Sequence, residues 1–415
     1  MSSSLVRSHL RRLCTAAAAA ATTKLAGKLS ISKTKNKLKH EHDPDVAVQI
    51  YKSFTSSNNL STSHASLRYA QESTVRRLAK FHRFSDIECF LESHKSDPQI
   101  KQEPFLSSLI RCYGLAGMLT NAHKLFDEMS ELGTPRTSLS FNALLNACIS
   151  SKLSERVPEY FKEIQAKYGV SPDKFSYGIL IKAYCEMGSL EMAVEKLREM
   201  EEKGIDVTPI ACTTILHGLY KKQRNDEAEK FWNEVMKKNG SFADVGAYNV
   251  RLMHIHEGDM EMVEALIEEM LDAGVKPDAI SYNYLISCYC KKGMMDEAKK
   301  VYDALGSKRC TPNTAIFKTL LFYLCKQGRY ATGYKVFKTS VKLHKIPDID
   351  TLKCLVEGLA KDGRKVEVKA MTRTLNKKLS PSLLKDWGKF VEDLGFAPMK
   401  PKEFDSGAKE AAARP

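Results

Sequence analysis

The chain is 415 residues long with a formal net charge of +14, and 43% of its residues are hydrophobic. That length accommodates two or three ordinary domains or one array of repeats. No segment reaches the roughly 18 consecutive apolar residues that span a membrane, which argues against a transmembrane protein and a membrane partner.

Residues 1–40 are predicted to be a mitochondrial transit peptide and a basic linker. They contain nine Lys or Arg residues, no acid, and many Ser and Ala residues, as import signals do. The early arginines favour the mitochondrial matrix over a plastid, and an ordinary basic arm is the alternative. Residues 41–415 keep only +5, the chain's +14 less those nine, so charge alone is weak evidence for a nucleic-acid partner.

Residues 41–102 are predicted to form degenerate helical repeats, with a weak copy from Arg68, and residues 103–379 a regular array. Successive copies in the array begin 34 to 36 residues apart. Their first residues are Glu103, Ser138, Lys174, Pro209, Val245, Ala279, Thr314 and Ile349.

Each copy is predicted to be a helix–turn–helix unit. A stretch with the apolar spacing of one helix face is often followed by Gly, which ends helices in the left-handed conformation. A second such stretch follows, and several copies close on Pro with Asp or Asn, which stops one helix and starts the next. Stacked units bury their apolar faces together, so we expect an all-α solenoid. A single helical bundle is the alternative, and the even spacing disfavours it.

Residues 380–415 are predicted to form a capping helix, within Ser380–Phe396, and a disordered tail. We find no nucleotide-binding, hydrolase, zinc-protease or zinc-deaminase motif. Cys288 and Cys290 lack the spacing of a zinc site, and His254 and His256 are predicted to be solvated. We therefore expect no enzyme activity, cofactor, metal or small-molecule substrate.

The segment "AISYNYLISCYCKKGMMDEAKKVYDALGSKRCTPN", Ala279 to Asn313, resembles a pentatricopeptide repeat (PPR) of the plain-repeat, P-type class known from plant mitochondria. The resemblance covers Glu103 to Leu379. It implies a right-handed superhelical solenoid that binds single-stranded RNA, with one repeat addressing one base.

The resemblance further implies that the fifth residue of a repeat reads the base and that the repeat's last residue helps it. An exposed Asn at such a place is otherwise a simple cap or a solvated residue. The implied ligand reads U-x-G-U-Y from 5′ to 3′. The pairs behind it are Asn142 with Asp173 and Asn249 with Asp278 for uridine, Thr213 with Asp244 for guanine, and Asn283 with Asn313 for a pyrimidine. No clear base follows from Ser107 with Thr137, Gly178 with Thr208, Lys318 with Asp348, or Lys353.

Two further sets of residues are expected to contact RNA. An apolar second residue should stack on each base; it is lost at Gly246 and shortened at Ala315. Basic residues at the end of the first helix are expected near the RNA backbone, although cations also suit a helix C-terminus. The stacking residues are Leu139, Phe175, Ile210 and Ile280, and the basic residues are Lys221, Lys291, Lys326 and Lys361.

We therefore expect a protein that binds single-stranded organellar RNA and influences transcript stability, processing or translation. Two alternatives stay open. One is a structural PPR component of the small subunit of the mitochondrial ribosome, and the other is a protein–protein scaffold.

Overall fold

The computed structural model describes residues 31–41, 43–57, 64–238, 242–255, 259–379 and 381–396. Every regular element among these residues is a helix, which confirms the all-α prediction. In this part of the chain no helix is long and apolar enough to cross a membrane. The contacts divide the chain into unit 1, Met1–Gly218, and unit 2, Leu219–Pro415.

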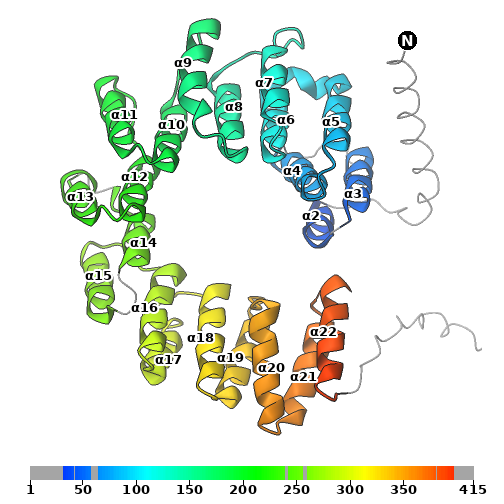
Figure 1. The fold of residues 1–415 in the computed structure, drawn as a ribbon, viewed down its shortest axis with the longest axis vertical. Coiled ribbons are helices and arrows are strands. Elements are labelled where there is room, and N and C mark those ends of the chain that lie inside the picture. The colour runs from blue at the N-terminus through cyan, green and yellow to red at the C-terminus, as the bar shows by residue number, and fades with distance from the viewer. Residues whose placement is uncertain are drawn as a thin grey trace, which may run out of the picture. The chain divides into compact units, whose positions relative to one another are not determined.

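The helices of unit 1 follow one another in antiparallel pairs from α4 onward (Figure 1). The last of them, α12, continues across the boundary into unit 2. They are α2 (Ile31–His40), α3 (Pro44–Ser57), α4 (His64–Lys80), α5 (Phe84–Glu92), the 3₁₀ turns η1 (Ser93–Ser96) and η2 (Pro98–Lys101), α6 (Glu103–Leu115), α7 (Leu119–Asp127), α8 (Ser138–Ser150), α9 (Arg156–Tyr168), α10 (Lys174–Met187), α11 (Leu190–Glu202) and α12 (Pro209–Lys221).

Unit 2 continues the same alternation of first and second helices. It consists of α13 (Asn225–Phe231), the π-helix η3 (Trp232–Lys237), α14 (Val245–His254), α15 (Met260–Asp272), α16 (Ala279–Lys291), α17 (Met295–Ala304), α18 (Thr314–Lys326), α19 (Tyr330–Lys342), α20 (Ile349–Lys361), α21 (Lys365–Asn376) and α22 (Pro381–Asp393).

The eight predicted repeat starts are the first residues of α6, α8, α10, α12, α14, α16, α18 and α20. In unit 1, α4, α6, α8 and α10 pack side by side, and in unit 2 so do α14, α16, α18 and α20. We call these the first helices of their repeats. The second helices α7, α9 and α11, and likewise α17, α19 and α21, each pack on the first helix of their own repeat.

A residue in the left-handed backbone region ends most of the first helices. Gly117 has φ +74° and Gly293 has φ +79°, where a side chain would be strained. Lys152 and Gln223 hold the same place without glycine. His82, at φ 56°, lies thirty-five residues before Gly117, which is the spacing of the array, but α4 begins at His64, four residues before the predicted weak copy at Arg68.

The Asp or Asn before a first helix caps it. Asp173, Asp244, Asp278, Asn313 and Asp348 each accept a backbone N–H of the following helix through the side chain. Such caps satisfy amide groups that have no partner inside the helix. The residue that closes one repeat therefore fixes the start of the next.

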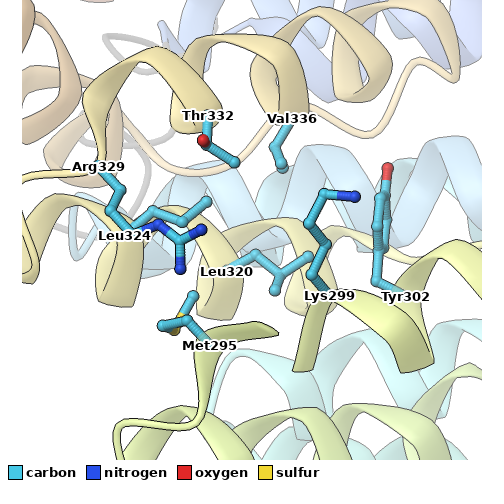
Figure 2. Close-up of a pocket in the computed structure, with 8 residues that line it drawn as sticks. All are labelled: Met295, Lys299, Tyr302, Leu320, Leu324, Arg329, Thr332 and Val336. Atoms are coloured by element: carbon cyan, nitrogen blue, oxygen red, sulfur yellow. The ribbon is translucent and has the colours of Figure 1, made fainter. Parts of the chain in front are cut away.

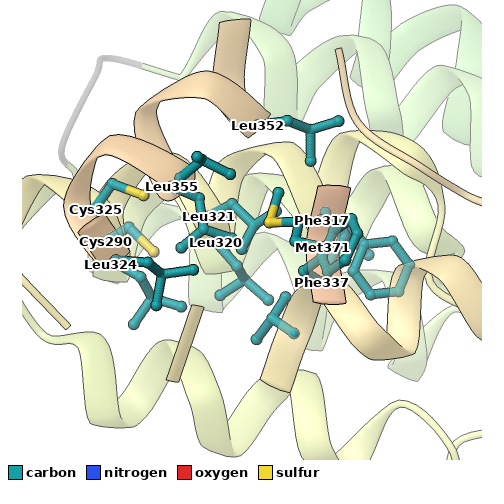
Figure 3. Close-up of a cluster of buried hydrophobic side chains, with 14 of the residues drawn as sticks. Cys290, Phe317, Leu320, Leu321, Leu324, Cys325, Phe337, Leu352, Leu355 and Met371 are labelled. Carbon is teal, nitrogen blue, oxygen red and sulfur yellow. The ribbon is translucent and has the colours of Figure 1, made fainter. Parts of the chain in front are cut away.

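Apolar side chains of neighbouring repeats form one buried core cluster in unit 2. Figure 3 shows part of it in unit 2, where Phe317, Leu321 and Leu355 are fully buried. Close contact in unit 1 depends on Gly114, since a Cβ there would lie 2.4 Å from Ala147 Cα of the neighbouring helix. The packed faces thus hold successive first helices in a fixed register.

The structure describes one helix within each of the two predicted terminal segments, residues 1–40 and 380–415. Residues 31–40, the last part of the segment predicted as transit peptide and basic linker, form α2, and Thr34 and Leu38 are buried by its packing on α3 and α4. The predicted capping helix corresponds to α22, whose Trp387 is fully buried against the core of unit 2. The rest of the predicted transit peptide and linker, residues 1–30, and the tail after residue 396 lie outside the described residues.

Candidate nucleic-acid interface

In unit 1 the side-chain amide of Asn142 is held by the repeat that follows it. Its Nδ2 donates to Asp173 Oδ1 at 3.1 Å, and its Oδ1 accepts from the Ser176 hydroxyl at 2.6 Å. Asn142 lies on α8, whereas Asp173 caps α10 and Ser176 lies in its first turn. Three residues from two adjacent repeats therefore make one hydrogen-bonded group.

Asp173 is held in place by the start of α10 as well as by Asn142. Its Oδ1 accepts the backbone N–H groups of Phe175 and Ser176, each at 2.9 Å. Partial burial acts to raise the pKa of Asp173, but hydrogen bonds from the Ser176 backbone, Asn142, Ser138 and the Ser176 side chain outweigh it and lower the pKa. The carboxylate is thus charged at neutral pH and acts only as an acceptor.

Unit 2 repeats this group with different residues. Asn249 Nδ2 donates to Asp278 Oδ1 at 3.2 Å, and the Ser281 hydroxyl donates to Asn249 Oδ1 at 2.7 Å. Asp278 accepts from the backbone N–H groups of Ile280 and Ser281 at 2.8 and 3.0 Å. We call each set of Asn, Asp and Ser an oriented-amide site.

The partners decide which way each amide faces. A carboxylate accepts only, so the amide nitrogen must face Asp173 or Asp278, and the amide oxygen faces the serine hydroxyl. Each Asn keeps one N–H and one oxygen lone pair beside each other. That combination complements a pyrimidine pairing edge, which offers a donor next to an acceptor.

Ser176 and Ser281 are members of the site that the sequence prediction omitted. Each is the third residue of the repeat after an Asn–Asp pair, and both side chains are buried. Their hydroxyls also accept from the N–H of Asp173 and Asp278, which completes a capping box. The recurrence of Ser three residues after that Asp is the signal that identifies them.

Asn283 has a different environment, although it occupies the same place in its repeat. Its Oδ1 accepts from the Thr319 hydroxyl at 3.1 Å, and Asn313 uses its own side chain to cap α18 through Ile316 N at 3.0 Å. Within the described residues no hydrogen bond joins Asn283 to Asn313. The third residue here is Ile316, which is buried in the core and supplies no hydroxyl.

The predicted guanine pair falls in two different units. Thr213 is half-buried on α12 in unit 1. Asp244 is exposed in unit 2 and caps α14 by accepting from Ala247 N at 2.9 Å. Each residue is thus described only within its own unit.

The fifth residues of the repeats without an assigned base have side chains in different environments. Ser107 is fully buried. Lys318 forms an ion pair with Asp348 at 3.0 Å, and Lys353 Nζ lies 5.5 Å from the centre of the Phe390 ring of α22. Gly178 contributes no side chain.

The predicted stacking residues are large apolar side chains that remain exposed. Leu139 is 40% exposed, Phe175 62%, Ile210 76% and Ile280 47%. Single exposed apolar residues are common on protein surfaces, but these four share the second place of their repeats. We call the second and fifth places of the first helices, within each unit, the reading face.

The predicted backbone-contacting lysines are all exposed. Each of the four is the last residue of its first helix, where a cation also interacts favourably with the helix dipole. They are Lys221, Lys291, Lys326 and Lys361.

The cysteines and histidines do not form a metal site in the described part of the chain, where no group of three or more His, Cys, Asp or Glu residues could hold an ion. Burial raises the pKa of Cys290 to about 12, as expected of a thiol that serves as a small core residue. His254 corrects the prediction of a solvated side chain, because it is half-buried and stacks on Tyr220. His256 lies outside the described residues.

A small apolar cavity lies between α17, α18 and α19 in unit 2 (Figure 2). Its volume is about 30 Å³, and Leu320, Leu324 and Val336 contribute to its lining. Sites for nucleotide-sized ligands occupy hundreds of cubic ångströms. This cavity is a packing defect rather than a ligand site.

Comparisons with known proteins follow the repeat pattern. Models of the PPR repeat match residues 106–134, 139–168, 168–201, 210–240 and 273–304. The crystal structure of the maize pentatricopeptide repeat protein PPR10 is 18% identical with a TM-score of 0.41, and the match covers 88% of this chain and 59% of that one.

Two relatives from Arabidopsis thaliana match along nearly their whole length. Small ribosomal subunit protein mL103 (rPPR7) is 52% identical over 100% of both chains. A mitochondrial pentatricopeptide repeat-containing protein is 52% identical over 95% of this chain and 93% of its own. Small ribosomal subunit protein mS79 (rPPR3b) is 46% identical over 32% of this chain and 34% of its own. The chain therefore belongs to the family of pentatricopeptide repeat proteins.

Proposed function

We propose that this chain is a mitochondrial single-stranded RNA-binding protein that works as a component of the small ribosomal subunit. The oriented-amide sites at Asn142 and Asn249 carry the RNA-binding part of the proposal. They present the same donor and acceptor in both units, held by the same three residue types at matching places. A packing role alone would not require the amide to be held from both sides.

The reading face supplies the other contacts that a nucleotide needs. Leu139, in the repeat of Asn142, and Phe175, in the next repeat, are both exposed, so a base reaching the amide would lie between apolar side chains. Stacking of this kind contributes about 1–3 kcal/mol per base. The lysines at the ends of α16, α18 and α20 would add phosphate contacts, whose contribution falls as salt rises.

The protein acts by occupying RNA and not by catalysis. Bound single-stranded RNA is kept unfolded and shielded from exonucleases. In a ribosomal subunit the reading face would hold a segment of ribosomal RNA, and the second helices would face neighbouring proteins.

The ribosomal role is supported by the relatives. A protein that matches this chain over its full length at 52% identity is named as a small ribosomal subunit protein, and so are two further partial matches. A second candidate function is the binding of one messenger RNA. The oriented amides favour it, because hydrogen bonds to base edges select a sequence.

Sedimentation and crosslinking of the protein in intact mitochondria separate these functions. We expect the protein to sediment with the small subunit after a wash in moderate salt and to crosslink to ribosomal RNA at a U-x-G-U-Y segment. A narrow crosslinking peak on one messenger, without cosedimentation, would favour the second candidate. No RNA above background would contradict both and leave a protein scaffold.

A further inference from the structure

The repeat that begins at Thr314 holds a lysine where the oriented-amide sites hold asparagine. Lys318 is the fifth residue of this repeat, and its Nζ lies 3.0 Å from Asp348 Oδ2. Both side chains remain accessible, at 60% and 39% exposure. The ion pair therefore forms part of the surface of unit 2.

The support around Lys318 matches that around Asn142. Asp348 caps α20 by accepting from Thr351 N at 3.1 Å, and the Thr351 hydroxyl donates to the same carboxylate at 3.1 Å. Thr351 is the third residue of its repeat, the place of Ser176 and Ser281. Burial acts to raise the pKa of Asp348, but the hydrogen bonds from Thr351 and Lys318 outweigh it and lower the pKa. The carboxylate thus stays charged and holds the ammonium in place.

The exchange of Asn for Lys changes what the site offers to a base. An ammonium has three N–H donors and no acceptor. One donor faces Asp348, which leaves two donors and nothing that accepts a hydrogen bond. A base matches them only if its edge presents adjacent acceptors. Cytosine does so with O2 and N3, and guanine with O6 and N7, whereas the uridine N3–H would meet another donor.

Size favours cytosine over guanine. Thr at the fifth place has a short side chain that leaves room for a purine, whereas the lysine chain is longer than that of Asn or Thr. A long side chain at this place brings its donors further out from α18 and leaves room for the smaller ring.

The same repeat carries an exposed aromatic ring beside Lys318. Phe322 is 53% exposed and lies one helical turn after Lys318, on the same face of α18. Its ring is perpendicular to that of Tyr323, with the ring centres 5.1 Å apart, and about half of the side chain stays accessible. The stacking residue at the second place is reduced here to Ala315. None of the other seven first helices of the array has Phe, Tyr or Trp at the place of Phe322, although the repeat that begins at Pro209 has His217 there.

We propose that the repeat at Thr314 binds a cytosine, with Lys318 as the donor-only reading residue and Phe322 as the stacking platform that replaces the shortened second residue. This inference rests on the proposed RNA binding and extends the implied ligand by one base, to U-x-G-U-Y-C. Lys318 and Phe322 are specificity-determining residues in this account.

Binding of the full chain to short RNAs of the form U-x-G-U-Y-N, with each base in turn at N, tests the proposal. We expect the wild type to prefer C over U and A by about tenfold, the size of a good two-contact base pairing. Lys318→Asn should shift the preference to U, because Asn with the Asp348 carboxylate and the Thr351 hydroxyl supplies the same hydrogen-bonding groups as the oriented-amide sites. Lys335→Asn on α19 removes an equal charge from an exposed second-helix position and should leave the preference for C intact.

Other outcomes overturn the proposal in distinguishable ways. If Lys318→Asn weakened binding equally for all four bases and reduced the salt slope by about one, Lys318 would contact a phosphate. If the wild type ignored the base at N but still selected U opposite Asn249, the cytosine site would be wrong and the proposed function would stand. If no RNA bound, both would fail.

Discussion

Two repeats of unit 2 place the same residue, asparagine, at the reading position but surround it differently. Asn249 is held from both sides by Asp278 and Ser281. Among the described residues, the Asn283 side chain accepts a hydrogen bond from the Thr319 hydroxyl but is not held by the next repeat's start, which is formed by Asn313 and the buried Ile316. The orientation of a reading residue is therefore decided by the repeat that follows it.

This difference has a simple physical basis. In both oriented-amide sites a single carboxylate oxygen, Oδ1 of Asp173 or Asp278, accepts from the amide nitrogen and also from the backbone N–H groups of the helix start, because a charged oxygen is a stronger acceptor than a neutral amide oxygen. Asn313 uses its single carbonyl oxygen on Ile316 N. A repeat with an oriented amide should discriminate between bases more sharply than one without.

The largest effect is expected from loss of both oriented amides. Asn142→Ala combined with Asn249→Ala should weaken RNA binding by about 2–6 kcal/mol, because each pairing contributes about 1–3 kcal/mol and the two sites are in separate repeats. Fluorescence anisotropy with a U-x-G-U-Y RNA measures this. Asn233→Ala, an exposed change away from the reading face, is the control. Equal affinity of the double variant and wild type would contradict the role of the amides.

The next effect concerns the serine that orients Asn249. Ser281→Ala should lower the free energy of unfolding by about 1 kcal/mol, since it removes one half of a capping box. It should also reduce the preference for U opposite Asn249, because the amide is no longer held from its oxygen side. Denaturant unfolding and base-substituted RNAs measure the two effects. Ser307→Ala, in an exposed turn, should change neither.

A smaller effect is expected from the charge of Asp173. Hydrogen bonds lower its pKa in the folded protein below the unfolded value of about 3.9. Its charge therefore stabilises the fold above pH 3.9, and that contribution is lost as pH falls through the lowered pKa. Asp173→Asn should lose at most about 1 kcal/mol at pH 7, because the group is partly exposed, and the difference from wild type should shrink as the pH falls below 3.9. A constant difference across this range would contradict the assignment.

The smallest effect is expected from a change at Asn313, the cap that follows the repeat of Asn283. Asn313→Asp restores a carboxylate beside Asn283 and should raise the preference for U over C at that repeat by roughly threefold, below 1 kcal/mol. Stability should hardly change, because Asp and Asn cap helices about equally well. Competition between U- and C-containing RNAs measures the ratio. An unchanged ratio would mean that the buried Ile316, and not the cap, limits the site.

The helix starts could be predicted from the sequence because their causes are local. The Pro–Asp ends supply a stop and a cap within a few residues, and the glycine at the left-handed position ends the first helix in five copies. These signals placed the eight starts at the first residues of their helices. The reading residues, predicted from the family resemblance, include the two Asn–Asp pairs that the structure brings within hydrogen-bond distance.

Three features could not be predicted from the sequence, because they depend on contacts between residues that are far apart in the chain. Ser176 reaches Asn142 across thirty-four residues of sequence, and no local pattern gives that distance. Helix α2 lies in the basic segment that the sequence predicts to be transit peptide and linker, and only packing on α3 and α4 reveals the buried Thr34 and Leu38. The stacking of His254 on Tyr220 is likewise a contact between distant residues that the local sequence does not indicate.

The most direct test of base reading by the oriented-amide sites is a double-mutant cycle between Asn249 and the base opposite it. The affinities of wild type and Asn249→Ala are measured for RNAs that carry U or A at that place. We predict that wild type prefers U by about 1–3 kcal/mol and that the variant loses this preference. An equal preference in both proteins would show that Asn249 does not read the base and would contradict base reading by the oriented-amide sites.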